Sequence, residues 1–236
     1  MEFQKISSPS LKELFVEQLE DMILSGKLKV GEKLPPERQL AEQMQVSRAV
    51  VNGGLSQLEK CGFITVKPRS GTFVADYRKN GNIDTLVAIM KYRGGRIRNE
   101  EIRSILEVRL ALDTLITKQV IEIANQETIE ELERQVEIMK QGESITKAVE
   151  AAYAFQHELA LASKNTLVPL IFQSFRSTIM AMWERFCTIY GTEILYSNNK
   201  KLLEYIRKRD TDGAIKWLEH SINECLDGSM QIYYEN

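Results

Sequence analysis

The sequence predicts a mainly α protein of two domains, the first of which carries a single short β-hairpin. Apolar residues recur at helical spacing along most of the 236 residues. After Gly62 the pattern changes to two short apolar runs, FITVKP and GTFVAD, which predict two strands joined by a turn. The polar stretch at residues 77–84 predicts a linker, so we expect domains at residues 1–76 and 85–236.

Two amphipathic helices are expected first. Residues 10–25 place apolar side chains at helical spacing, with Ser10 as a cap and Gly26 just past the end. The following stretch, KLKVGEKLPP, contains a glycine and two prolines and predicts an extended connection. A second helix begins near Pro36, since proline is tolerated in a first helical turn, and continues through ERQLAEQM.

A third helix is expected over residues 47–60, SRAVVNGGLSQLEK. Ser47 is placed to accept a hydrogen bond from the first backbone amides of this helix. The apolar stripe of the helix, at i, i+4 and i+7, consists of Val51, Leu55 and Leu58.

Two adjacent glycines interrupt this helix, and each costs roughly 1 kcal/mol relative to alanine in a helix interior. Gly53 is expected to point away from the core, whereas Gly54 is expected to lie near the packing side. On this basis Gly54→Ala is expected to raise the stability of the protein by about 0.5 to 1 kcal/mol.

The second domain is expected to be entirely helical. Helix-breaking residues divide it into six or seven helices without a strand, at Gly94, Gly95, Asn125, Gly142, Asn165, Gly191 and Asp210.

Charge and composition limit the classes of function. Ten basic and five acidic side chains lie between residues 27 and 79, although the whole chain has a formal net charge of −2. This excess suits nucleic-acid binding, and an ordinary solvated surface explains it equally well. Three cysteines are too few for a disulfide framework. No apolar run is long enough to cross a bilayer and the N-terminus lacks a signal-peptide pattern, so we expect a cytoplasmic protein without a membrane partner.

Two short helices joined by a tight turn and followed by a hairpin predict a winged helix-turn-helix, whose second helix enters the major groove of DNA. Arginine reads guanine and asparagine reads adenine through paired hydrogen bonds, and a helix N-terminus suits a phosphate oxygen. A basic hairpin tip reaches the minor groove or its phosphates, or is simply a solvated turn. The expected DNA-binding residues are Arg38, Ser47, Arg48, Ala49, Asn52, Lys67, Arg69, Ser70 and Gly71.

Residues 31–74, GEKLPPERQLAEQMQVSRAVVNGGLSQLEKCGFITVKPRSGTFV, resemble the N-terminal domain of the GntR family of bacterial transcription regulators. The family pattern contains L-P-[SP]-E-R-x-L-A, V-S-R-x-x-V-R-x-A-L and G-T-F-V. Two departures matter: Asn52 stands where relatives carry a DNA-contacting arginine, and Arg69 stands where the wing commonly has glycine.

The second domain resembles the FadR-like subfamily, whose helical bundle binds a small effector and forms a homodimer. The matching stretches are EEIRSILEVRLALDTLITKQV, FQHELALASKN and YIRKRDTDGAIKWLEHSI. Many members hold a divalent metal with one aspartate and three histidines. The four corresponding positions carry Ala152, Gln156, Asn199 and Ser221, and neither His157 nor His220 falls on them. We therefore expect no metal and no cofactor.

Loss of the metal set is shared with the acyl-CoA-responsive branch of the subfamily, so a fatty acyl-CoA or another organic acid is the expected effector. The apolar helix predicted at residues 167–190 either lines an acyl tunnel or is ordinary core. Arg109 lies on the buried stripe of its helix, where it either binds an anionic group of the effector or pairs with Asp113. The expected effector-binding residues are Arg109, Asp113, Gln156, Asn199 and Ser221.

The leading interpretation is a dimeric repressor or activator whose affinity for double-stranded operator DNA changes when the effector binds. One alternative is a DNA-binding dimer without an effector. Another is an enzyme that uses the helical bundle as its pocket, against which no nucleophile–base pair, phosphate-binding glycine loop or metal set is visible in the sequence.

Overall fold

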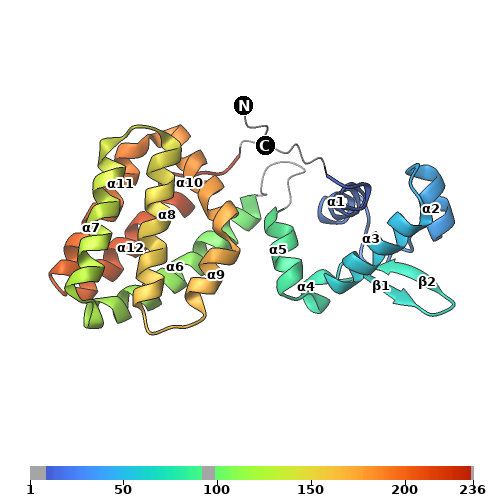
Figure 1. Cartoon of the computed structure of the whole chain (residues 1–236), viewed down its shortest axis with the longest axis horizontal. Helices are drawn as coiled ribbons and strands as arrows, with labels where there is room; N and C mark the ends of the chain where they lie inside the picture. The colour runs from blue at the N-terminus through green and yellow to red at the C-terminus, as the bar shows by residue number, and fades with distance from the viewer. Residues whose placement is uncertain (1–8, 92–98, 235–236) are drawn as a thin grey trace, which may run out of the picture. The chain divides into compact units, whose positions relative to one another are not determined.

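The computed structural model describes residues 9–91 and 99–234 and confirms the mainly α fold. The chain divides into two compact units, Met1–Arg96 and Ile97–Asn236, each with its own hydrophobic core (Figure 1).

The N-terminal unit begins with the three predicted helices. Ser10 caps the first helix through a reciprocal capping box: Ser10 Oγ accepts from the Glu13 amide at 3.2 Å, and Glu13 Oε2 accepts from the Ser10 amide at 2.7 Å. Ser47 Oγ accepts from the Val50 amide at 3.3 Å, which confirms the predicted cap of the third helix. The elements of this unit are α1 (Leu11–Leu24), α2 (Glu37–Gln43), α3 (Arg48–Lys60), β1 (Ile64–Lys67), β2 (Gly71–Val74), α4 (Tyr77–Asn80) and α5 (Ile83–Lys91).

The predicted hairpin forms, and a third segment pairs with it. β1 and β2 are antiparallel, in the register that sets Ile64 opposite Val74. On the other edge of β2, the Leu34 amide donates to the Thr72 carbonyl at 2.9 Å and the Val74 amide donates to the Glu32 carbonyl at 2.8 Å. The stretch predicted as an extended connection therefore covers the second edge of the hairpin.

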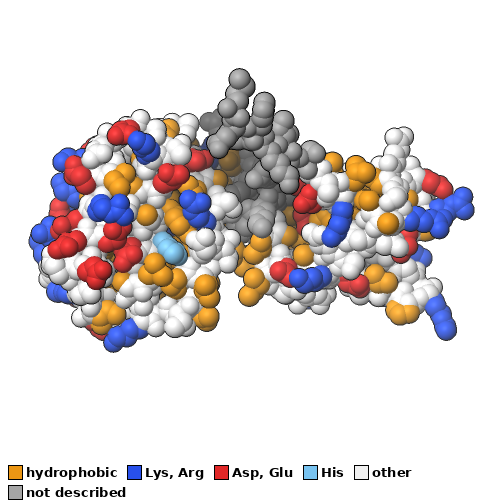
Figure 2. Space-filling view, in the orientation of Figure 1, with side chains coloured by type: hydrophobic (Ala, Val, Ile, Leu, Met, Phe, Trp, Pro, Cys, Tyr) orange, Lys and Arg blue, Asp and Glu red, His pale blue; other side chains and the backbone are white. Residues whose placement is uncertain are grey.

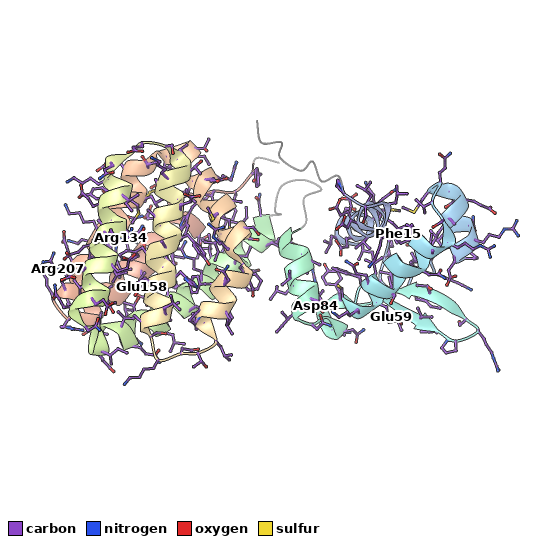
Figure 3. The ribbon with its side chains drawn as sticks, viewed as in Figure 1. Phe15, Glu59, Asp84, Arg134, Glu158 and Arg207 are labelled. Atoms are coloured by element: carbon purple, nitrogen blue, oxygen red, sulfur yellow. The ribbon has the colours of Figure 1, made fainter. Side chains whose placement is uncertain are left out.

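The packing around Gly54 differs from what the sequence led us to expect. A Cβ atom built on Gly54 would lie 2.7 Å from Cε1 of Phe15 and closer still to Cδ1. Phe15 belongs to α1, is only 1% exposed, and is labelled between α1 and α3 in Figure 3. The expectation that Gly54→Ala stabilises the protein is therefore wrong, because the buried ring occupies the space of the added methyl group.

The segment expected as a linker, residues 77–84, is instead folded onto the N-terminal unit. Asn82 and Thr85 form a capping box at the start of α5, with the Asn82 amide donating to Thr85 Oγ1 at 2.7 Å. Asn82 Nδ2 donates to the Lys60 carbonyl at 2.8 Å, and Thr85 Oγ1 donates to the Cys61 carbonyl. These bonds satisfy carbonyls at the end of α3, so α5 belongs to the N-terminal unit rather than to the helical domain.

The described part of the C-terminal unit contains seven helices and, as predicted, no strand; with α5, the range expected as the helical domain holds eight described helices rather than six or seven. The central helix, α8, packs against α7, α9, α10 and α11, and contributes Val149, Ala152, Phe155 and Leu159 to the core (Figure 1). Breaks predicted at Asn125, Gly142, Gly191 and Asp210 coincide with observed helix caps, whereas Gly94 and Gly95 lie outside the described residues. The helices are α6 (Asn99–Ile123), α7 (Gln126–Gln141), α8 (Ile145–Ala162), α9 (Val168–Ser174), α10 (Arg176–Tyr190), α11 (Thr192–Arg207) and α12 (Thr211–Leu226).

One break in this unit was not predicted. The helix expected over residues 167–190 is divided at Phe175, whose backbone angles are φ −103° and ψ 11°. Ser174 Oγ donates to the Leu170 carbonyl at 2.8 Å, a side-chain bond that competes with the helical ladder and bends helices. Neither glycine nor proline marks the position in the sequence.

Candidate nucleic-acid interface and effector cavity

The predicted recognition helix, α3, presents its N-terminus to solvent. Arg48 is its first residue, and Arg48, Ala49 and Asn52 are exposed, whereas Val51 and Leu58 are fully buried. This division between the two faces is the one predicted from the helical spacing.

Two of the expected DNA contacts have partners within the protein. With its amide nitrogen turned toward α2, Asn52 donates to Glu37 Oε2 at 2.8 Å and to the Arg48 carbonyl at 3.3 Å. Arg38 Nε donates to Glu42 Oε1 at 2.8 Å, and both side chains remain largely exposed. An exposed pair of this kind is worth little, so Arg38 is free to exchange Glu42 for a phosphate.

The hairpin tip carries the predicted wing residues. Lys67, Arg69 and Ser70 are exposed, and the Ser70 amide donates to the Lys67 carbonyl at 2.9 Å to close the turn. Arg69 adopts a left-handed backbone with φ +62°, the conformation for which glycine is usual. Figure 2 shows Lys and Arg side chains at the hairpin tip and over α2.

Gly71 is among the expected DNA-binding residues, and its backbone conformation by itself favours glycine. Its φ is +117°, which side-chain-bearing residues rarely adopt. Beside it, the ammonium groups of Lys67 and Lys33 lie 4.9 and 5.9 Å from the centre of the Phe73 ring.

The N-terminal unit also contains an open groove of about 1080 Å³ between α1, α3 and α5. Glu20 lines this groove and is 8% exposed. Burial, together with the charge of Glu17, raises the pKa of Glu20 to about 7. The sequence reasoning missed this carboxyl, which falls at a buried position of an otherwise regular amphipathic helix.

A small cavity lies inside the C-terminal unit, among α6, α8, α10, α11 and α12. Its volume is about 70 Å³, room for on the order of five water molecules. Four of the five residues expected to bind an effector line it: Arg109, Gln156, Asn199 and Ser221. The fifth, Asp113, is joined to the cavity through Arg109.

Arg109 is held between a carboxylate and an aromatic ring. Its Nε donates to Asp113 Oδ2 at 3.1 Å, and its guanidinium carbon lies 4.6 Å from the centre of the Trp183 ring. Asp113 is 1% exposed, and burial raises the pKa of Asp113 although Arg109 opposes that shift. Arg109 thus pairs with Asp113, which is one of the two roles that the sequence left open, and it also lines the cavity.

The other polar side chains that line the cavity differ in whether their hydrogen-bonding atoms have partners. Gln156 is 3% exposed, and its Oε1 has no hydrogen-bond partner among the described residues. Asn199 Nδ2 donates to the Leu195 carbonyl at 2.8 Å, and Ser221 Oγ donates to the Leu218 carbonyl at 3.1 Å. Arg109 and Gln156 therefore both line the cavity, the first as a cation and the second as a buried amide whose oxygen is unpaired.

The residues present do not fit a divalent metal. The corresponding side chains offer a methyl, two amides and a hydroxyl, with no imidazole or carboxylate. His157 stacks on Tyr153 and His220 contacts Trp217, so neither histidine lines the cavity. Among the described residues, no group of three or more His, Cys, Asp and Glu side chains is arranged to bind a metal.

Two further features of the cavity were missed from the sequence. Trp217 Nε1 donates to the Asn198 carbonyl at 3.0 Å and fixes α12 against α11 at the edge of the cavity. Ile232, in the segment that follows α12, also lines the cavity. No periodicity marks that short segment as part of a site.

A winged helix-turn-helix followed by a helical unit with an internal cavity is the architecture of a ligand-responsive DNA-binding regulator. Residues 11–74 match the family model of bacterial regulatory proteins of the gntR family, and residues 104–224 match that of the FCD domain. The chain belongs to the GntR family and carries an FCD domain.

The relatives are transcriptional regulators, which excludes the enzyme alternative. LutR of Bacillus subtilis (strain 168) is 31% identical over 163 residues, 67% of this chain and 71% of LutR. YcbG of the same strain is 26% identical over 87% of this chain and 84% of YcbG. Mce2R of Mycobacterium tuberculosis is 36% identical, but the match spans 47% of this chain and only 45% of Mce2R.

One solved structure supports the fold over nearly the whole chain. Lar, which controls the expression of the agr system of Listeria monocytogenes, aligns with a TM-score of 0.63 over 95% of this chain and 98% of Lar. At 15% identity the likeness concerns the fold alone. Separately, no helix among the described residues is long and apolar enough to span a membrane.

Proposed function

We propose that this protein is a homodimeric transcription repressor or activator that binds operator DNA through α3 and the wing, and a small organic acid in the cavity of its FCD domain. The observation that carries the proposal is that one cavity is lined both by the cation Arg109 and by Gln156, a buried amide whose Oε1 has no hydrogen-bond partner among the described residues. A carboxylate complements the first group and a hydroxyl donor complements the second. The protein acts in the bacterial cytoplasm, where operator DNA lies.

On the DNA side, Arg48 and Asn52 are proposed to contact bases, while Ser47 and Arg38 contact phosphates. Paired hydrogen bonds to a base need both the amide nitrogen and the oxygen of Asn52, so this contact competes with the bond that the amide nitrogen makes to Glu37. Lys67, Arg69 and Ser70 are proposed to contact the minor groove or its phosphates.

The size of the cavity favours a short acid over a fatty acyl-CoA. A volume of about 70 Å³ suits a ligand of on the order of five non-hydrogen atoms. Ligand pockets for larger molecules usually exceed about 300 Å³. The apolar side chains of α10 that line the space belong to a packed core rather than to a tunnel; they are Met182, Trp183 and Phe186.

Dimerisation is proposed through the exposed apolar stripe of α6. Val108 is 59% exposed and Leu115 is 39% exposed, and they lie seven residues apart on one face of the helix. Sedimentation of the full chain and of Leu115→Glu tests this point. A monomeric variant beside a dimeric wild type supports the interface, and an unchanged dimer places it elsewhere.

The function is tested by selecting a DNA duplex that binds the full chain and measuring its affinity at several salt concentrations, with and without acetate, lactate and hexanoate. Arg48→Ala is expected to weaken specific binding by about 1–3 kcal/mol. Arg109→Gln is expected to leave DNA binding intact and to abolish its response to the acid, whereas Arg134→Gln, on the surface of α7, retains the response. Absence of any response in the wild type favours the alternative of a DNA-binding dimer without an effector.

A further inference from the structure

The chain that follows α12 closes one side of the effector cavity. Residues 230–234 form no helix or strand, and we call them the C-terminal strap. Ile232 in the strap is 3% exposed. Every other residue that lines the cavity lies on a helix, in α6, α8, α10, α11 or α12. The strap is therefore the part of the described cavity wall whose displacement would leave every lining helix intact.

Side chains of α10 hold the backbone of the strap. Arg185 Nε donates to the Ile232 carbonyl at 2.6 Å, and Arg185 Nη2 donates to the Tyr233 carbonyl at 2.7 Å. The same guanidinium lies 3.7 Å from the centre of the Tyr234 ring. Tyr190 OH donates to the Gln231 carbonyl at 2.7 Å.

The other end of the strap is fixed to α6. Asn99, the first residue of that helix, donates through Nδ2 to the Tyr234 carbonyl at 2.9 Å and accepts from the Tyr234 amide at 2.8 Å through Oδ1. α6 and α10 also supply Arg109 and Trp183 to the cavity. The elements that hold the strap are thus the elements that form the proposed carboxylate site.

We propose that the C-terminal strap is a closing wall of the effector cavity, and that Ile232 limits the length of the acid the cavity accepts. The limit on length rests on the proposed function, whereas the closing role does not. A carboxylate bound to Arg109 extends its carbon chain toward apolar walls, and Ile232 is the wall supplied from outside the helices. Arg185 and Tyr190 position the strap and do not touch the ligand.

The closing role is tested without any ligand. Cys225 lines the cavity and is half-buried, so an increase over the wild-type rate at which N-ethylmaleimide modifies it reports wider access to that space. Buried Cys61 and Cys187 serve as internal controls. In the full chain, Arg185→Gln and the milder Tyr190→Phe are expected to raise the rate at Cys225 several-fold. The matched controls, Arg207→Gln and Tyr196→Phe, lie on α11, outside the set of side chains that bond to the strap, and are expected to leave the rate unchanged. Equal rates in wild type and both strap variants overturn the closing role.

The limit on length is tested with straight-chain carboxylates from acetate to octanoate, using the thermal stabilisation of the full chain. Ile232→Ala is expected to shift the best-stabilising acid toward longer chains by two or more carbons. The control, Ile179→Ala, removes a buried aliphatic side chain of α10 that does not line the cavity, and it is expected to keep the wild-type preference. The same preference in Ile232→Ala overturns the role of Ile232. If no acid stabilises any of these proteins, the effector class and the length limit fall together, and the labelling rates still decide whether the strap closes the cavity.

Discussion

The ring of Phe15 in α1 occupies the space beside Gly54 in α3 that any larger residue would need. α1 and α3 are the most extensively packed pair of helices in the N-terminal unit, and Phe15 is a fully buried member of its core. Close approach at Gly54 thus accounts for a residue that weakens the helix locally.

Gly54→Ala is expected to lower the stability of the protein by about 1–3 kcal/mol, the usual cost of overpacking a core. Gly53→Ala is the matched control, because a Cβ there would meet only Lys12 Cδ, at 3.6 Å. That variant is expected to gain up to about 1 kcal/mol of helix propensity. Thermal melts of both variants measure the difference, and a stabilised Gly54→Ala contradicts the packing described.

Glu20 is expected to make the N-terminal unit more stable at mildly acidic pH than above pH 7. Its pKa is about 7 in the folded protein against 4.5 for an ordinary glutamate. Between these two pH values the folded state holds a proton that the unfolded state releases. The free energy of unfolding therefore falls by about 3 kcal/mol as the pH rises from about 4.5 to 7. Glu20→Gln should flatten this dependence and stabilise the protein most above pH 7. Parallel pH profiles for wild type and variant would show that Glu20 is not the responsible group.

Thr85→Val is expected to destabilise the N-terminal unit by about 1–3 kcal/mol. The substitution keeps the shape of a 3% exposed side chain but removes the hydroxyl that donates to the Cys61 carbonyl and accepts from the Asn82 amide. Thr65→Val, at an exposed position of β1, is the control and should change little. Chemical denaturation compares the two, and equal midpoints count against the role given to the hydroxyl.

Arg69→Gly is expected to act in opposite directions on stability and on DNA binding. Glycine relieves the left-handed backbone at φ +62°, worth about 1 kcal/mol, and at the same time removes a proposed phosphate contact. Affinity for the selected duplex should fall and its dependence on salt should become shallower by about one unit of slope. Arg69→Lys keeps the charge and should retain the salt dependence. An unchanged slope in Arg69→Gly would remove the wing tip from the interface.

Much of the fold could be predicted because its signals are local. Ser10 and Ser47 cap helices through bonds to amides three residues away, and the buried stripe of α3 follows from helical spacing alone. Contacts between segments that are distant in the sequence produce no comparable local pattern. The packing of Phe15 on Gly54 joins residues 39 positions apart, and the path of the strap past α10 depends on Arg185 reaching carbonyls 47 and 48 residues further along.

The candidate site divides in the same way. Arg109 could be found because a cation on an apolar stripe demands a partner. Ile232 could not, because one isoleucine in a short irregular segment has no pattern that distinguishes it from ordinary core.

Because Asn82 and Thr85 bond to the end of α3, the N-terminal unit needs residues beyond the hairpin in order to fold independently. A fragment cut after Val74, where the match to the gntR family model ends, would leave the Lys60 and Cys61 carbonyls without the donors that now satisfy them. Such a fragment would also uncover Phe63, whose ring lies 5.6 Å from that of Tyr77. The smallest fragment expected to fold and bind DNA independently therefore extends through Lys91, the last residue of α5.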